Sequence, residues 1–255
     1  MKINRPKPKS KKLLFTLFFA LLYSNFNLIS IFAQEKQIVE TSSITEPARI
    51  PNHLHDSLFS TYYQQRVSHF RSLPIHPNSI VFLGNSITDG AEWSELFANS
   101  SIINRGISGD KTAGILNRLD EITNRKPLKV FLLIGTNDLE HKIPQQEVID
   151  NIFLIARILK QDSPDTKLYI QSILPVNDFY KKFNNHTKNG KAIEQINTVL
   201  SENAVKYSYK FIDLHRSFID AEGKLKKDLT NDGLHLNGKA YQEWKELILP
   251  FVLEE

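Results

Sequence analysis

The strongest constraint on the fold of this chain is a regular alternation of short apolar segments with helical segments, which begins at residue 79. The apolar segments have hydrophobic residues on consecutive positions, as expected of strands that are covered on both faces. They are Ser79–Leu83, Ser101–Asn104, Lys129–Ile134, Lys167–Leu174 and Lys210–Leu214. Segments with helical spacing lie between them, most clearly at 145–160, about 190–206 and about 238–253. The alternation predicts an α/β fold with a parallel sheet and helices on both of its sides.

Composition agrees with one large domain and argues against a nucleic-acid partner. The chain has 255 residues, of which 41% are hydrophobic, so a sizeable core is feasible. Six of the 32 basic residues lie before Gln34, where there is no acidic residue, which leaves 26 basic against 28 acidic residues in the rest. The body of the protein therefore lacks the concentration of cations that a phosphate backbone requires.

The first 33 residues have the pattern of a secretory signal peptide. A basic start precedes the apolar run LLFTLFFALLY (13–23), and the small residue Ala33 suits cleavage before Gln34. Asn25 and Asn27 interrupt the apolar character, so the segment is a poor membrane-spanning helix, although an uncleaved N-terminal anchor is the alternative. The chain has no cysteine, which excludes disulfides and cysteine-linked lipid. We therefore expect export to a bacterial periplasm or exterior, with no stable membrane partner after cleavage.

A linker and a helix are expected between the signal peptide and the main domain. Residues 34–51 are polar and show no sustained period. Residues 53–72 place aromatic and aliphatic side chains at helical spacing, which indicates an amphipathic helix packed on the main domain. The predicted organisation is thus a signal peptide (1–33), a linker with an amphipathic helix (34–78) and a main domain (79–255).

Polar, glycine-containing segments follow four of the predicted strand regions. They are Gly-Asn-Ser (84–86), Asn-Arg-Gly-Ile-Ser-Gly-Asp (104–110), Gly-Thr-Asn-Asp (135–138) and Asp-Gly-Leu-His-Leu-Asn (232–237). In open α/β sheets, ligands bind outside the carboxyl ends of the strands. We call this side of the sheet the carboxyl edge, and we expect the four segments to meet there.

Together these segments supply the groups that acyl transfer needs. Ser86 offers a hydroxyl nucleophile, His235 a base, and Asp232 a carboxylate that would orient the base from three residues away. The backbone N–H groups of Ser86 and Gly109 and the side-chain amide of Asn137 would donate to an oxyanion. Each residue alone also fits an ordinary turn or helix cap. Their joint occurrence at strand ends favours a catalytic site.

The four motifs, as a set, resemble those of the SGNH hydrolases, also called the GDSL esterases and lipases. The resemblance covers roughly Ser79 to Glu254. It implies a three-layer α/β/α sandwich with a five-stranded parallel sheet, which is the flavodoxin-like SGNH hydrolase fold. It also implies Ser86 as nucleophile, Asp232 and His235 as the other triad members, and Gly109 and Asn137 as oxyanion donors.

One residue departs from the family pattern, and four residues are candidates for substrate contacts. Asn85 stands where the family name implies aspartate, and this replacement keeps an acceptor but removes a charge.

Asn85, Arg105 and Asp110 lie inside the motifs and are candidates to contact substrate, although Arg105 and Asp110 would alternatively brace the carboxyl edge. Trp93 is a candidate to line the site, and a core position is its alternative.

The segments VFLGNSITDGAEW and INRGISGD look most like the acetylhydrolase branch of the family. The resemblance implies a serine esterase that removes acetyl groups, and together with the predicted export it makes carbohydrate O-acetyl esters outside the cytoplasm the expected substrates. Alternatives are a lysophospholipase, thioesterase or arylesterase, and a non-catalytic glycan-binding protein. The sequence implies neither a metal nor an organic cofactor. We expect a small-molecule or glycan ester as the substrate, and the sequence does not indicate an oligomeric state.

Overall fold

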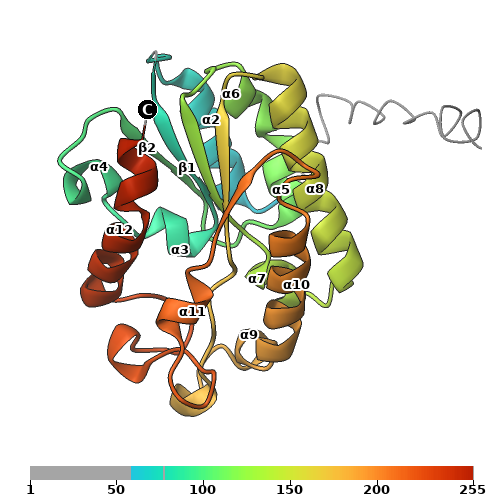
Figure 1. The fold of residues 1–255 in the computed structure, drawn as a ribbon, viewed down its shortest axis with the longest axis vertical. Helices are drawn as coiled ribbons and strands as arrows, with labels where there is room; N and C mark the ends of the chain where they lie inside the picture. The colour runs from blue at the N-terminus through green and yellow to red at the C-terminus, as the bar shows by residue number, and fades with distance from the viewer. Residues whose placement is uncertain (1–58, 77, 255) are drawn as a thin grey trace, which may run out of the picture. The chain divides into compact units, whose positions relative to one another are not determined.

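Five short strands pair in parallel in a computed structural model that describes residues 59–76 and 78–254 (Figure 1). The strands are β1 (Ile80–Gly84), β2 (Ile102–Gly106), β3 (Lys129–Leu133), β4 (Lys167–Gln171) and β5 (Lys210–Ile212). Their order is β2-β1-β3-β4-β5, the flavodoxin-like order. The predicted α/β class with five parallel strands is confirmed. The predicted signal peptide (1–33) and the polar linker segment (34–51) lie outside the described residues.

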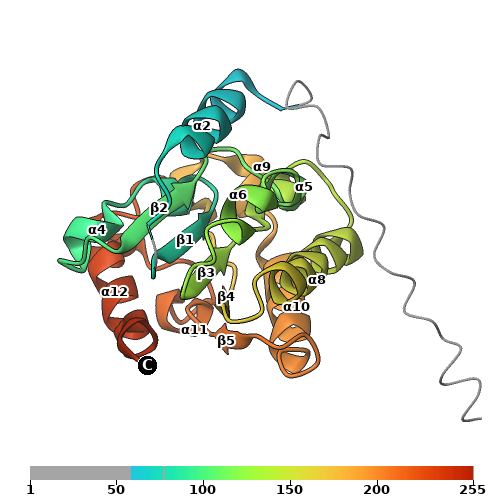
Figure 2. The same ribbon diagram turned by 90° about the horizontal axis from the view of Figure 1, so that it is seen from above.

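Helices cover both faces of the sheet and make the three layers visible in Figure 2. On one face lie α5 (Thr112–Asn117), α6 (Leu119–Thr123), α8 (Gln145–Asp162) and α10 (Gly190–Glu202). On the other lie α4 (Trp93–Leu96), α11 (His215–Phe218) and α12 (Gly238–Leu253). The long helices α8, α10 and α12 occupy the three predicted helical segments. Among the described residues, no helix combines the length and apolar character needed to cross a bilayer.

Alternate residues of each strand enter two separate hydrophobic layers. In β1, Val81 and Leu83 pack toward α8, whereas Ile80 and Phe82 pack toward α12. Because side chains alternate across a strand, a strand covered on both faces needs apolar residues at consecutive positions. This is the physical origin of the apolar runs that predicted the sheet.

Trp93 belongs to the α12-side core and not to the site, so its proposed contact with substrate is wrong. Its side chain is only 1% exposed, and its ring stacks on Phe82 with centroids 4.1 Å apart. The indole N–H donates to the Thr88 carbonyl at 2.8 Å. The bulk of the ring is therefore buried in the core, which was the alternative that the sequence left open.

Helix α2 (Thr61–Ser72) lies beside strand β2 (Figure 2). Ser60 caps it by accepting a hydrogen bond from the Tyr63 N–H. Its buried stripe consists of Tyr63, Val67 and Phe70, which cluster with Ile107 just after β2. The predicted amphipathic helix is therefore present from Thr61 to Ser72, while residues 53–58 of that prediction lie outside the described residues.

Three further short helices and two 3-10 turns gather at the carboxyl edge. They are α3 (Ser86–Asp89), α7 (Thr136–Glu140), α9 (Asn184–Thr187), η2 (Asp178–Tyr180) and η3 (Lys227–Leu229). Gly106 at the end of β2 lets α3 approach, because a Cβ there would clash with the backbone of Asp89. The absence of a side chain at this glycine thus sets how closely α3 lies against the sheet.

We predict that Gly106→Ala lowers the free energy of unfolding by about 1–3 kcal/mol, since the added methyl group forces backbone apart in a packed region. Gly238→Ala is the matched control, because Gly238 begins α12 and a Cβ there meets open space. Urea denaturation of both variants measures the effect. Equal stability of the two variants would contradict the close approach of α3 and β2.

Candidate active site

Ser86 stands at the first turn of α3, directly after strand β1. β1 ends at Gly84, and Asn85 caps α3 by accepting a hydrogen bond from the Ile87 N–H at 3.0 Å. Ser86 is the first helical residue, so its own N–H has no acceptor within the helix. The strand-to-helix turn therefore places the hydroxyl and the N–H of one residue at the carboxyl edge.

The structure brings Ser86, His235 and Asp232 into direct contact. The Ser86 Oγ lies 3.0 Å from His235 Nε2, and His235 Nδ1 lies 2.8 Å from Asp232 Oδ2. An ionised carboxylate only accepts, so Nδ1 carries the proton and Nε2 presents its lone pair to the serine hydroxyl. This is the arrangement in which an imidazole can remove a proton from a hydroxyl nucleophile.

The carboxylate of Asp232 is held ionised by the turn that it begins. Burial alone would raise the pKa of Asp232, but donation from the Leu234 N–H and from the ring and backbone of His235 outweighs it and lowers the pKa. Both backbone N–H groups reach Oδ1 at 2.8 Å. Gly233 has a φ of 88° within this turn, a conformation that glycine adopts without strain. The local D-x-x-H spacing therefore produces the Asp–His contact.

Gly109 and Asn137 lie on one cleft at the carboxyl edge. Gly109 has a φ of 82°, and a Cβ there would meet no atom, so its backbone faces open space. The Asn137 side chain is 6% exposed, and its Nδ2 donates to the Asp110 carbonyl at 2.8 Å. The segments after β2 and β3 thus contribute adjacent groups to this cleft, as the sequence predicts for Gly109 and Asn137.

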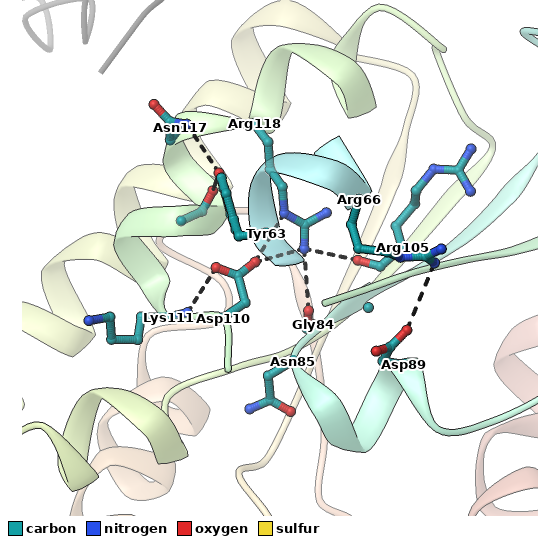
Figure 3. Close-up of polar contacts among 12 residues, drawn as sticks. Tyr63, Arg66, Gly84, Asn85, Asp89, Arg105, Asp110, Lys111, Asn117 and Arg118 are labelled. Atoms are coloured by element: carbon teal, nitrogen blue, oxygen red, sulfur yellow. Dashed lines mark hydrogen bonds and ion pairs between the residues drawn. The ribbon is translucent and has the colours of Figure 1, made fainter. Parts of the chain in front are cut away.

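A buried arginine that the sequence did not single out ties these segments together (Figure 3). The Arg118 guanidinium donates from Nε and Nη2 to the Asp110 carboxylate, at 3.0 and 2.9 Å. Its Nη2 also reaches the carbonyls of Gly84 and Arg105, at 3.3 and 2.9 Å. Burial raises the pKa of Asp110 to about 6, so the carboxylate is ionised at neutral pH and pairs with Arg118. One side chain therefore links the ends of β1 and β2 to the loop that carries Gly109.

The remaining predicted substrate contacts are wrong, because all three side chains are buried. Asn85 is 0%, Asp110 3% and Arg105 4% exposed. Asn85 caps α3 and Asp110 pairs with Arg118, while Arg105 Nε donates to Glu121 at 3.1 Å. Arg105 and Asp110 brace the carboxyl edge, which was the alternative that the sequence left open.

Asp89 of α3 links the second motif to helix α2. Its Oδ2 accepts from the hydroxyl of Ser108 at 2.8 Å and from that of Tyr62 at 3.0 Å. Arg66 of α2 approaches the other carboxylate oxygen at 3.8 Å (Figure 3). Ser108 immediately precedes Gly109, so α2 helps to hold the loop that carries Gly109.

The cleft has a second wall that sequence reasoning missed. The cleft has a volume of about 590 Å³. Besides Gly109 and Asn137, the residues that line it and form the second wall are Glu140, His141, Phe183, Asn184, Asn185 and His186. Phe183 is 42% exposed, and its ring meets that of His235 edge-on with centroids 5.1 Å apart. These residues come from α7 and from the loop and short helix after β4. No spacing or motif in that region marks them, so only the fold shows that they border the site.

Comparisons with known proteins identify the family of this chain. The sequence model of the GDSL-like lipase/acylhydrolase family matches residues 82–243. The chain is 28% identical over 168 residues to platelet-activating factor acetylhydrolase IB subunit alpha2 of Rattus norvegicus, covering 64% of this chain and 70% of that protein. The solved structure of a Streptococcus pneumonia protein named as a platelet activating factor has a TM-score of 0.69 and 30% identity, covering 75% of this chain and 92% of the other.

An acetyl xylan esterase also has this fold, with a TM-score of 0.57 and 19% identity, over 69% of this chain and 100% of the other. At that identity the likeness concerns the fold alone. The match to the family model spans more than half of the sequence. The chain belongs to the GDSL-like lipase/acylhydrolase family. It is a carboxylic ester hydrolase with the α/β fold of that family.

The hydrogen bonds of Asp232 predict a pH-dependent contribution to stability. Its folded-state pKa lies below that of an unfolded aspartate, about 3.9, so the contribution is complete above that value and is lost as pH falls through the folded-state pKa. We expect wild type to exceed Asp232→Asn in unfolding free energy at neutral pH, by a margin that shrinks below about pH 4. Urea titrations across pH measure the margin, and a constant margin would contradict the assignment.

Proposed function

We propose that this protein is a secreted serine esterase that hydrolyses short-chain esters, above all O-acetyl groups on carbohydrates, through a Ser86–His235–Asp232 triad. The observation that carries the proposal is the continuous contact from the Ser86 Oγ to His235 Nε2, at 3.0 Å, and from His235 Nδ1 to Asp232, at 2.8 Å. Family membership supplies the reaction class, and this contact supplies the groups that perform it.

In the proposed reaction the Ser86 Oγ attacks the ester carbonyl carbon while its proton moves to His235 Nε2. Asp232 accepts from His235 Nδ1–H and stabilises the imidazolium that forms. His235 then gives the proton to the departing alcohol, which leaves an acyl-enzyme on Ser86. A water molecule repeats the attack with His235 as base and releases the carboxylic acid.

The negative charge on the carbonyl oxygen would be received by three donors. They are the Ser86 N–H, which has no acceptor within α3, the Gly109 N–H and the second N–H of the Asn137 amide. Gly109 and Asn137 border the same cleft, which supports a shared target for their donors. Such donors are already in place before the reaction and need no reorganisation during it, and for this reason they stabilise the transition state effectively.

The residues of the second wall favour a substrate whose alcohol part is polar. Glu140, His141, Asn184 and Asn185 present groups that exchange hydrogen bonds with hydroxyls, whereas a long acyl chain needs an apolar groove. Phe183 adds one exposed aromatic ring next to His235. Polar groups beside one exposed aromatic ring suit a sugar ring. The name of the relative platelet-activating factor acetylhydrolase refers to an acetyl group, which supports acetyl as the acyl group.

Secretion is the part of this proposal that rests on the sequence alone. The basic, apolar and small-residue pattern of residues 1–33 supports export with cleavage before Gln34. Acetylated glycans outside the cytoplasm would then be accessible substrates. N-terminal sequencing of the protein recovered from the producing cell's exterior or periplasm tests this part, and a chain that begins at Met1 would favour a retained anchor.

We predict that Ser86→Ala leaves only a trace of hydrolysis of p-nitrophenyl acetate, because it removes the nucleophile. Asn137→Ala should lower kcat by about 10²–10³, the usual effect of losing one oxyanion donor. Steady-state kinetics with folded, purified variants measure both values. Wild-type turnover by Ser86→Ala would refute the triad assignment.

Substrate size is tested by comparing acetyl with octanoyl p-nitrophenyl esters, and we expect the acetyl ester to give the higher kcat/KM. Phe183→Ala should raise KM for O-acetylated xylan fragments or O-acetylated sialic acid about tenfold, measured by the acetate released, since it removes the aromatic surface. Phe179→Ala is the matched control, because Phe179 is 59% exposed but does not line the cleft. A preference for the octanoyl ester would favour a lysophospholipase-like or thioesterase-like activity instead.

A further inference from the structure

The Asn137 amide is held from two sides by groups distant in sequence. Its Nδ2 donates to the Asp110 carbonyl at 2.8 Å, and its Oδ1 contacts His186 Nε2 at 2.9 Å. Asp110 follows Gly109, and His186 lies in α9 after β4. A primary amide has two N–H groups, so the contact with Asp110 leaves one of them for a ligand.

The two contacts together determine which way the amide faces. A backbone carbonyl only accepts, so the amide nitrogen must lie toward Asp110 and the amide oxygen toward His186. His186 Nε2 must then carry a proton and donate it to Oδ1. If the amide flipped, its oxygen would face the Asp110 carbonyl, and an acceptor would replace a donor at the oxyanion position.

His186 is half-buried and belongs to the second wall of the cleft. Burial lowers its pKa, and the neighbouring His235 and His141 lower it further against the opposing effect of Glu140. A neutral imidazole carries one N–H, and the contact with Asn137 assigns that proton to Nε2. The His186 ring also meets the Phe183 ring edge-on, with centroids 5.8 Å apart, and its backbone N–H donates to the Phe183 carbonyl.

We propose that His186 is a positioning residue, which holds the Asn137 amide with its free N–H aimed at the oxyanion. This inference rests on the proposed function, because it requires Asn137 to act as an oxyanion donor. His186 acts only through Asn137 and exchanges no proton with the substrate. Loss of its N–H leaves Oδ1 without its donor, which frees the amide to rotate or flip out of the geometry that the transition state needs.

Two variants of His186 separate the hydrogen bond from the ring. His186→Phe keeps an aromatic ring against Phe183 but removes the N–H. His186→Gln removes the ring but retains an N–H donor at similar reach. We expect His186→Phe to lower kcat for p-nitrophenyl acetate about tenfold or more with KM little changed, and His186→Gln to recover most of the loss. Thermal unfolding of both variants checks that each is folded.

A double-mutant cycle with Asn137→Ala provides the decisive test. If His186 acts through the amide, His186→Phe costs nothing further in kcat once the amide has gone. Full kcat in His186→Phe, or the same fold loss in the Asn137→Ala background, would overturn the inference while leaving the proposed function intact. An Asn137→Ala variant with wild-type kcat would instead remove the oxyanion role on which the inference rests.

Discussion

The buried guanidinium of Arg118 is the interaction on which the geometry of the carboxyl edge depends. Arg118 is 1% exposed, and its guanidinium donates to the Asp110 carboxylate. It also donates to the carbonyls of Gly84, the last residue of β1, and Arg105, the residue before the last of β2. Removing one partner from a buried ion pair typically costs about 3–5 kcal/mol, because the remaining charge has lost its compensation. The first two motifs are therefore fixed relative to each other by a side chain that does not border the cleft.

The other parts of the site are carried by the segments that this arginine holds together and by later segments of the chain. β1 delivers Ser86, the loop after β2 delivers Gly109, and α7 delivers Asn137, each at the end of its strand. The Asp232–His235 turn reaches across to Ser86 from a segment 149 residues later in the chain. The loop and short helix after β4 contribute Phe183 and His186 to the second wall. The segments after β1, β2 and β3 and the turn before α12 thus hold the groups proposed to react. Helix α7, the loop after β4 and α9 form the surface proposed to meet the alcohol.

Sequence reasoning succeeded where the physical cause was local. Five apolar runs predicted five strands because each strand is covered on both faces, and the Asp232–His235 spacing predicted a contact made within a single turn. It left alternatives open where long-range packing decides the role of a side chain. Trp93 fills the core, while Arg105 pairs with Glu121 and Asp110 pairs with Arg118 in buried ion pairs. Arg118 and His186 had no local pattern, because their partners lie in segments that only the fold brings close.

The central claim is that Ser86 is the nucleophile of a Ser86–His235–Asp232 site. Incubation with a fluorophosphonate, followed by proteolysis and mass spectrometry, tests it most directly, because the reagent bonds covalently to an activated serine oxygen. The account predicts a single phosphonylated peptide that contains Ser86, and much slower modification when His235 is replaced by alanine. An unmodified Ser86, or equal modification rates with and without the His235 imidazole, would contradict it.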